Sequence, residues 1–430
     1  MVATNYQKKN NKLITQLNLI FCLYICAWII VPVFRSMTNQ GVFQLLFFLV
    51  VVMWFLTSLL LSRKWFYNLL GISLIGSVYI ITMLLYYLFG YGDMKITQLV
   101  PTILLFVFVY MGYFYFSQGS STSVNIIIKF IAFCFIITAA TTAYNLLIDI
   151  NVSRLITSAS TSTEVIRYLE SRNVAGFDFI YGTILLIPIL LMGLKQSFKT
   201  KLFLPLLIIV TAAISVLALS NFTTAYLFLI IAIFLAFFTS YKNIYLVFIT
   251  VASIMGILFP ILLTTLIGIL EYIRDITPSI MTQDKLMSVI GILEGNSDIE
   301  SASIRTLLME TSINGFLSNP FIGFGAYYHD HNMIGNHSQF IDDLGRYGII
   351  GSLPIFIFMF YSLMIIKRRL QGTKVRNSFI FCSLLFLLLG FLNPIQSYGI
   401  IFAIFLVLPL ISRYLQENST KYSSDRRVKV

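Results

Sequence analysis

Residues 41–61 read GVFQLLFFLVVVMWFLTSLLL, an apolar run without a single charged side chain. A helix of about 20 such residues crosses the ~30 Å hydrocarbon layer of a bilayer. The whole chain is 58% hydrophobic and only 11% charged, with a mean hydropathy of +0.89. These values lie outside the range of soluble globular domains. The sequence therefore predicts an all-α, polytopic membrane protein in which residues 1–430 form one integral membrane domain.

Apolar runs of this kind recur along the chain and predict about twelve transmembrane helices. Short polar links join most of them, whereas two links are long, at residues 149–176 and 269–348. Because the spans are nearly free of charge, we expect function to reside in these two loops. The predicted spans are 17–34, 41–61, 66–89, 98–116, 124–148, 177–194, 201–219, 222–239, 244–268, 349–366, 377–393 and 397–412.

The distribution of charge predicts the orientation of the chain. With the N-terminus in the cytoplasm, 19 of the 29 Lys and Arg residues fall on the cytoplasmic side, against 2 of the 17 acidic residues. The positive-inside rule therefore predicts cytoplasmic N- and C-termini and places both long loops outside. The net charge of +12 is explained by this topology, and no basic patch interleaved with aromatic residues indicates a nucleic-acid partner.

Several catalytic classes lack their motifs in this sequence. It contains no G-x-x-x-x-G-K-[ST] loop, no H-E-x-x-H and no G-x-S-x-G. No cytoplasmic loop is large enough for a nucleotide-binding domain. We therefore expect a substrate that comes from the membrane or from outside.

The loop 269–348 begins its most informative part with a helix pattern. Apolar residues spaced between 304 and 316 predict an amphipathic helix that carries Arg305 and ends at Asn319-Pro320. The turn that follows contains Gly323 and Gly325, which permit an unusual backbone dihedral angle or a close approach of the backbone to a ligand. An ordinary loop turn is the alternative.

Residues 335–351, GNHSQFIDDLGRYGIIG, are predicted to be a helix that leads into the tenth span. At about 100° per residue, His337 shares the apolar face, and Asp342, Asp343 and Arg346 point to the opposite side. In one interpretation, a backbone carbonyl satisfies the histidine and Asp342 pairs with Arg346 on a solvated face. In the other, the imidazole titrates near neutral pH and takes a proton from a hydroxyl group.

Three arginines in the outer loops are candidates for binding a phosphate. Arg305 could grip phosphate oxygens through its bidentate fork. Arg167 and Arg172 in the 149–176 loop supply further cations. Surface ion pairs with Glu164 and Glu170 are the alternative role of the last two.

A zinc site is a further alternative, because His329-Asp330-His331 and His337 lie in one loop. Oxygen or sulfur ligands at helical spacing are missing there, so we expect no metal and no cofactor. The four cysteines all fall in apolar spans, where free thiols behave as small hydrophobic groups.

Two motifs of the 269–348 loop resemble those of a known superfamily. NPFIGFG at 319–325 has the form Pro-hydrophobic-hydrophobic-Gly-x-Gly, and NHSQFIDDLGRYGIIG at 336–351 has the form of a His-containing signature that ends in Tyr-Gly. Together with about a dozen spans and a large outer loop, these motifs resemble the O-antigen ligase and polymerase superfamily. Within it, the chain is most similar to the capsular and O-antigen polysaccharide polymerases.

This resemblance implies a metal-independent, inverting glycosyltransferase of the GT-C type in a bacterial plasma membrane. Its substrates would be undecaprenyl-pyrophosphate-linked oligosaccharides, joined on the outer face. The resemblance gives catalysis to His337 and Arg305. The expected substrate-binding residues are Arg167, Arg172, Gly323, Gly325, Asp342 and Arg346.

The expected partners are membrane lipid and, by the same resemblance, a flippase and a chain-length regulator. A ligase of the superfamily, with the same chemistry and a different acceptor, is one alternative. A transporter of lipid-linked sugars is another, but it should show charged residues in mid-span and an internal repeat. A non-enzymatic scaffold would leave the His-containing motif unexplained.

Overall fold

The computed structural model describes residues 2–38, 42–89, 99–156, 162–198, 200–220, 222–241, 267–277, 283, 286–287, 290–291, 300–324, 334–335 and 337–427. Within these ranges the chain forms helices and no strand, which confirms the predicted all-α class for this part of the protein. The helices used below are α1 (Val2–Ile30), α2 (Pro32–Thr38), α3 (Val42–Leu61), α4 (Lys64–Leu88), α5 (Leu99–Ser117), α6 (Ser121–Ile148), α7 (Val152–Leu155), α8 (Thr163–Ser171), α9 (Phe177–Ser197), α10 (Phe203–Leu219), α11 (Thr223–Phe237), α14 (Glu300–Ser318), α15 (Gln339–Arg369), α16 (Thr373–Leu392), α17 (Tyr398–Phe402), η6 (Ala403–Val407) and α18 (Leu408–Arg427).

The apolar helices coincide with the predicted spans. Among the described residues, eight helices are long and apolar enough to cross a membrane, and three shorter apolar helices follow the second, seventh and eighth predictions. The protein is therefore a multi-pass membrane protein. The ninth predicted span, 244–268, lies almost entirely outside the described residues, so the count of twelve stays a prediction. The eight are Lys12–Ile30, Lys64–Leu88, Leu99–Ser117, Ser121–Ile148, Phe177–Ser197, Gln339–Arg369, Thr373–Leu392 and Tyr398–Asn418, and the three are Leu45–Leu61, Phe203–Leu219 and Thr224–Ser240.

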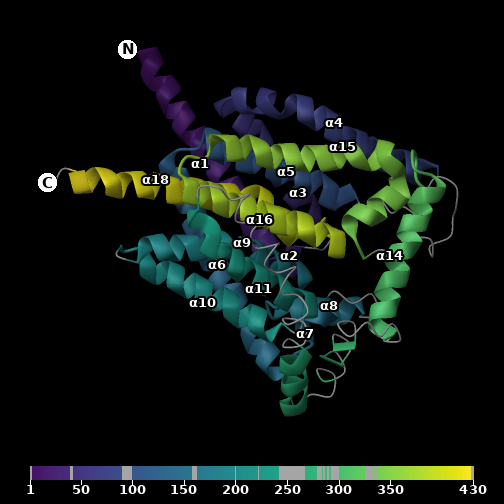
Figure 1. The fold of residues 1–430 in the computed structure, drawn as a ribbon. Helices are drawn as coiled ribbons and strands as arrows, with labels where there is room; N and C mark the ends of the chain where they lie inside the picture. Colours follow the sequence, from purple (N-terminus) through teal and green to yellow (C-terminus); the bar gives the residue numbers. More distant parts are fainter. Residues whose placement is uncertain are drawn as a thin grey trace.

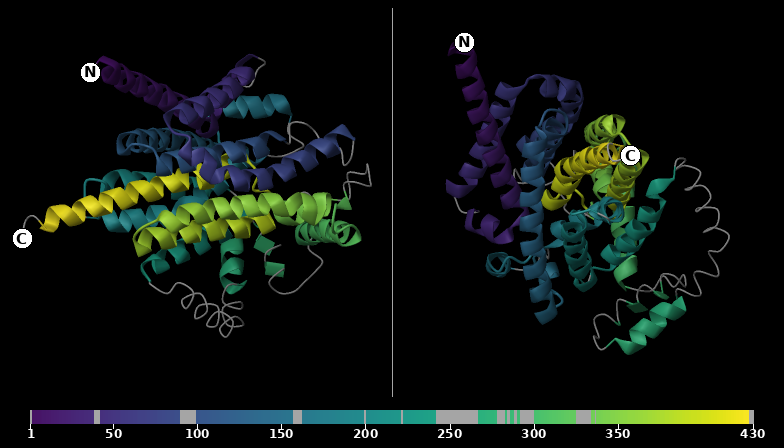
Figure 2. Two further views of the ribbon diagram at one scale, coloured as in Figure 1. Left: turned by 90° about the horizontal axis from the view of Figure 1, so that it is seen from above. Right: turned by 90° about the vertical axis from the view of Figure 1, so that its left-hand side faces the viewer.

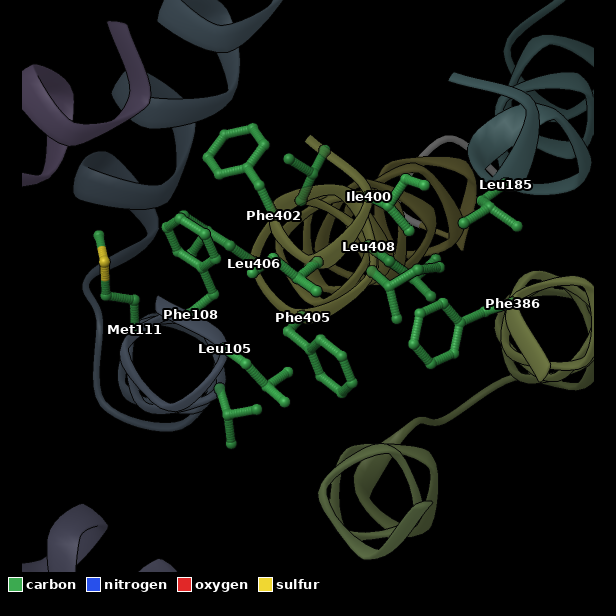
Figure 3. Packing of buried hydrophobic residues seen from close by; sticks show 14 of the residues in the cluster. Leu105, Phe108, Met111, Leu185, Phe386, Ile400, Phe402, Phe405, Leu406 and Leu408 are labelled. Carbon is green, nitrogen blue, oxygen red and sulfur yellow. The ribbon is translucent and has the colours of Figure 1, made fainter. Parts of the chain in front are cut away.

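A continuous helix made of α17, the π-helical turn η6 and α18 runs through the core. Its side chains pack against α5 on one side and against α9 and α16 on the other (Figure 3). The close approach of α5 needs a glycine, because a Cβ atom at Gly112 would collide with the carbonyl oxygen of Phe405. The last span is therefore enclosed by other helices, and lipid does not surround it.

Buried polar contacts join the first helices of the bundle. The side chain of Asn18 on α1 donates to the Ser58 hydroxyl on α3 at 2.7 Å and accepts from the Tyr115 hydroxyl on α5 at 2.7 Å. Groups of this kind find no water in the hydrocarbon layer, so helix-to-helix hydrogen bonds satisfy them. This network fixes α1 against α3 and α5.

Helix α14 runs across one end of the bundle. Figure 1 shows it at a steep angle to α15 and α16, at the end opposite to both chain termini, and Figure 2 shows the two termini at the same end from above. Helix α15 comes from the α14 end and bends at Gly348, where its dihedral angles leave the helical region (φ 62°, ψ −170°). Helix α14 and the start of α15, which carry Arg305 and the residues next to His337, therefore meet at the end of the bundle away from the termini (Figure 1).

Cysteine labelling in intact cells tests which end faces outward. The four native cysteines are buried, so the background of labelling should be low. We expect an impermeant thiol reagent to label Thr163→Cys and to leave Gln118→Cys and Gln371→Cys unlabelled until the cells are opened. All three positions are exposed, so a difference in labelling reports on membrane side. Labelling of Gln371→Cys with protection of Thr163→Cys would reverse the orientation and place the α14 end in the cytoplasm.

Candidate active site

The turn after α14 docks directly on the bend in α15. At the bend, the amide groups of Ile349 and Ile350 donate to the carbonyl oxygens of Pro320 and Phe321, at 2.8 and 3.0 Å. Gly323 (φ 79°) and Gly348 (φ 62°) both have positive φ values. A Cβ atom on Gly348 would overlap the carbonyl oxygen of Phe321 and the amide nitrogen of Gly323. We call this contact of 320–323 with 348–350 the glycine junction.

The glycine junction shows why the turn after α14 has a glycine at position 323. Gly323 does adopt an unusual dihedral angle, and its close backbone neighbours belong to the protein itself, at residues 346–348. Its predicted role in substrate binding is not tested by this geometry. Gly325 lies outside the described residues.

Aromatic side chains of α4 and α15 support the glycine junction. The Tyr86 hydroxyl donates to the carbonyl oxygen of Ile322. The Tyr347 ring contacts the rings of Tyr79 and Tyr86 at centroid distances of 5.2 and 5.4 Å. These contacts tie the turn and the bend to α4.

Asp342 holds the start of α15 against α14. One carboxylate oxygen accepts from the Ser312 hydroxyl of α14 at 2.6 Å, and the other accepts from the amide of Ser338 at 2.8 Å. Ser312 also accepts from the amide of Gly335 at 2.8 Å. Asp342 is only 7% exposed, so the expectation of a solvated face is wrong for this residue. The reason is that α14 covers the face, and Asp342 fixes the backbone next to His337.

Asp343 is also buried, at 2% exposure. Its carboxylate accepts from the Tyr79 hydroxyl of α4 at 3.1 Å and from the Gln339 side-chain amide at 3.0 Å. The Gln339 side-chain oxygen in turn accepts from the backbone amide of Gln396, in the link between α16 and α17, at 3.2 Å. Asp343 therefore belongs to a network that joins the start of α15 to two other parts of the bundle.

His337 lies outside the helix that the sequence assigned to it. Helix α15 begins at Gln339, and Ser338 is its N-cap, with an extended backbone (φ −127°, ψ 115°) and a side chain that accepts from the amide of Ile341. The prediction that His337 shares a helix face is therefore wrong, because the N-cap ends the helical geometry at Ser338. The imidazole is exposed beside a clamped backbone, where a substrate could reach it.

The predicted arginines occupy different elements. Arg305 lies on α14, two turns before Ser312, and its side chain lies outside what the structure describes. Arg346 lies on α15, half-buried, with its guanidinium carbon 5.9 Å from the Tyr347 ring centroid. Arg167 is on α8 and Arg172 directly follows it, both exposed, and neither pairs with a carboxylate of the described residues. The structure does not test the binding roles of these arginines.

The structure contains a charged cluster that the sequence analysis did not predict. Arg35 on α2 is buried and pairs with Glu170 of α8 at 3.1 Å and with Asp178 of α9 at 3.6 Å. One sequence alternative paired Glu170 with the neighbouring Arg167 or Arg172. In the structure, Glu170 pairs with Arg35 instead. The only available signal was that Arg35 and Asp178 are charged residues at the ends of apolar spans.

The zinc alternative is not tested, because His329 and His331 lie outside the described residues.

A comparison with protein families found a match for part of the chain. Residues 207–356 match the Wzy_C family model, which is described as O-antigen ligase. The match covers about a third of the chain and includes most of α10, all of α11 and α14, the glycine junction and the first half of α15. A comparison with curated proteins found no match.

Proposed function

We propose that this chain, which carries an O-antigen ligase family domain over residues 207–356, polymerises lipid-linked oligosaccharide repeat units. The family supports a membrane enzyme of polysaccharide assembly that transfers glycans, and the finer assignment is ours. The substrates would be undecaprenyl-pyrophosphate-linked repeat units and the product a capsular or O-antigen-type polysaccharide. The reaction would take place on the outer face of a bacterial plasma membrane.

One observation carries the proposal: His337 is exposed within the matched region, next to a backbone held by Asp342, Ser312 and Ser338. A general base must be both accessible and fixed in position, because a small displacement from the acceptor lowers the rate steeply. Clamping the backbone beside an exposed imidazole supplies both conditions. Arg305 lies on α14, the helix that also provides Ser312, so a cation lies on one of the elements that hold this backbone.

The proposed reaction uses these two groups in different roles. The imidazole of His337 accepts the proton of an acceptor hydroxyl while the oxygen attacks the anomeric carbon of the donor. The bond between that carbon and the pyrophosphate oxygen breaks, and the electron pair leaves with undecaprenyl pyrophosphate. The guanidinium of Arg305 stabilises the charge on the leaving group. Attack from the opposite side inverts the anomeric configuration, and the imidazolium then returns its proton to water.

Ligation is the second candidate, and the description of the matching family as O-antigen ligase favours it. A ligase would perform the same transfer onto a protein, a wall polymer or another lipid. The two functions differ in the acceptor alone. The product therefore discriminates them, because a polymerase leaves the growing glycan on the lipid carrier.

Purified protein and purified lipid-linked repeat units test the proposal directly. We expect a ladder of lipid-linked products with increasing numbers of repeat units, formed equally well in the presence of EDTA. In the native host, deletion should leave single repeat units on the lipid carrier at the outer face. Transfer to an acceptor other than the lipid carrier would favour ligation, and repeat units trapped on the inner face would favour transport.

Replacing Arg305 with lysine tests the proposed grip on the pyrophosphate. Lysine keeps the charge but lacks the planar fork. We expect the rate of ladder formation to fall about 10- to 100-fold, the worth of one hydrogen bond to a charged group. Arg274→Lys is the matched control, since Arg274 lies in the same loop and pairs with Asp275 at 2.9 Å. Equal rates for the two variants would make Arg305 a structural residue.

A further inference from the structure

A cavity of about 320 Å³ lies beside the Arg35 cluster, apart from His337. Its lining includes the charged side chains of Arg35, Glu170 and Asp178 and the aromatic rings of Trp28, Phe47 and Tyr398. We call it the Arg35 cavity. Its volume is at the lower end of the range for small-molecule sites. Its walls come from α1, α2, α3, α5, α8, α9 and α17 and from Ile156 after α7, so helices far apart in sequence form it.

The charges in the Arg35 cavity disfavour an anionic ligand. Arg35 already has two carboxylates, Glu170 at 3.1 Å and Asp178 at 3.6 Å, and the side chains of Arg35 and Glu170 are 10% and 11% exposed. Two carboxylates around one guanidinium leave a net negative charge in a buried place. A pyrophosphate would be repelled there, whereas the remaining carboxylate lone pairs can accept hydrogen bonds from hydroxyl groups.

One of the lining residues, Trp28, carries a hydrogen-bond donor without a partner in the described part of the chain. The indole nitrogen of Trp28 is buried and has no hydrogen-bond partner among the described residues, although Trp28 is only 6% exposed. Its ring is fixed by stacking on Phe47 at 4.1 Å and by an edge contact with Tyr398 at 5.7 Å. A buried indole N–H normally has an acceptor, and its absence here points to a ligand that supplies an oxygen.

The link between α16 and α17 connects the Arg35 cavity to the start of α15, next to His337. The amide of Gln396 donates to the side-chain oxygen of Gln339, the first residue of α15, at 3.2 Å, and Tyr398, two residues later, lines the cavity. Asp178 fixes the end of this link, because its carboxylate accepts from the amide of Gly399 at 3.3 Å. A group bound in the cavity would therefore have a fixed position relative to the start of α15.

We propose that the Arg35 cavity binds an uncharged sugar ring of the glycan, as a subsite remote from the pyrophosphate. This inference rests on the proposed function. Aromatic rings pack against the apolar faces of a sugar, the carboxylates accept from its hydroxyl groups, and the Trp28 N–H donates to one of its oxygens. The combination fits a neutral polyhydroxylated ring and does not fit a phosphate.

A binding measurement tests the subsite. The probe is the free oligosaccharide released by mild acid from the lipid-linked repeat unit of the native host, titrated calorimetrically into the full-length protein in detergent. We expect Trp28→Phe, which keeps an aromatic ring and removes the N–H, to weaken binding about 3- to 10-fold, the range of one neutral hydrogen bond. Inorganic pyrophosphate should not compete with the probe.

Trp65→Phe is the matched control. Its indole N–H donates to the Ser58 carbonyl oxygen at 3.2 Å, and Trp65 does not line the cavity, so probe binding should be unchanged. Unchanged binding in Trp28→Phe, or competition by pyrophosphate, would overturn the subsite. Absence of probe binding to a wild-type protein that still forms the ladder would overturn the subsite alone. Probe binding by a protein that forms no ladder would overturn the proposed function and leave the subsite standing.

Discussion

Alanine in place of His337 should lower ladder formation from lipid-linked repeat units at least ~100-fold, the lower end of what general acid–base catalysis contributes. Glutamine at this position should lose as much, because it can hydrogen-bond but cannot take up a proton at neutral pH. Expression and membrane insertion should stay normal. The side chain is exposed, and the backbone beside it is held by the contacts of Asp342 and Ser338, which neither substitution removes. The measurement is the initial rate of ladder formation with purified protein.

His331→Ala is the control that separates a base from a metal site. If His337 acts as a base, loss of His331 should leave the rate within a few-fold of wild type, and EDTA should have no effect. If the histidines of this loop bind zinc together, both variants and EDTA should abolish activity alike. A full ladder from His337→Ala would show that this histidine is not the base.

The spans were predictable from sequence because hydropathy is a local property. Each described apolar helix falls where a nearly uncharged run of sufficient length predicted it. Helix α14 was predictable for a similar reason, since its apolar spacing and the Asn319-Pro320 stop are local signals, and the helix does end at Ser318. The start of α15 was misplaced, although Ser338 followed four residues later by Asp342 is a recognisable N-terminal pattern.

The environment of the carboxylates could not be read in the same way. Asp342 is buried by Ser312, 30 positions earlier, and Asp343 by Tyr79, 264 positions earlier. Their pattern on a helix wheel shows which side they face but not what covers that side. The pairing of Arg35 with Glu170 spans 135 positions and depends on the packing of α2 on α8. One sequence without its fold contains no signal for such contacts.

The glycine junction provides the second large expected effect. Gly348→Ala should lower ladder formation about 100-fold, the cost of misplacing a catalytic group by about 1 Å. The added methyl group would overlap the carbonyl oxygen of Phe321 and the amide nitrogen of Gly323, so the turn must move away from α15. That movement breaks the hydrogen bonds from Ile349 and Ile350 and loosens the attachment of the 320–323 turn to α15. The rate is measured in the same assay, with the melting temperature recorded for the same samples.

Gly372→Ala is the control that separates the effect of the collision at the glycine junction from the backbone strain of placing alanine at a positive φ. Gly372 also has a positive φ, 85°, but nothing lies within 4 Å of the position its Cβ would take. Both substitutions place alanine at a positive φ, which costs about 1–3 kcal/mol of backbone strain, and only Gly348→Ala adds a collision. We therefore expect similar modest losses of melting temperature from strain, with a further loss and the fall in rate confined to Gly348→Ala. If both variants keep the wild-type rate, the contact of the turn with the bend is not needed for catalysis.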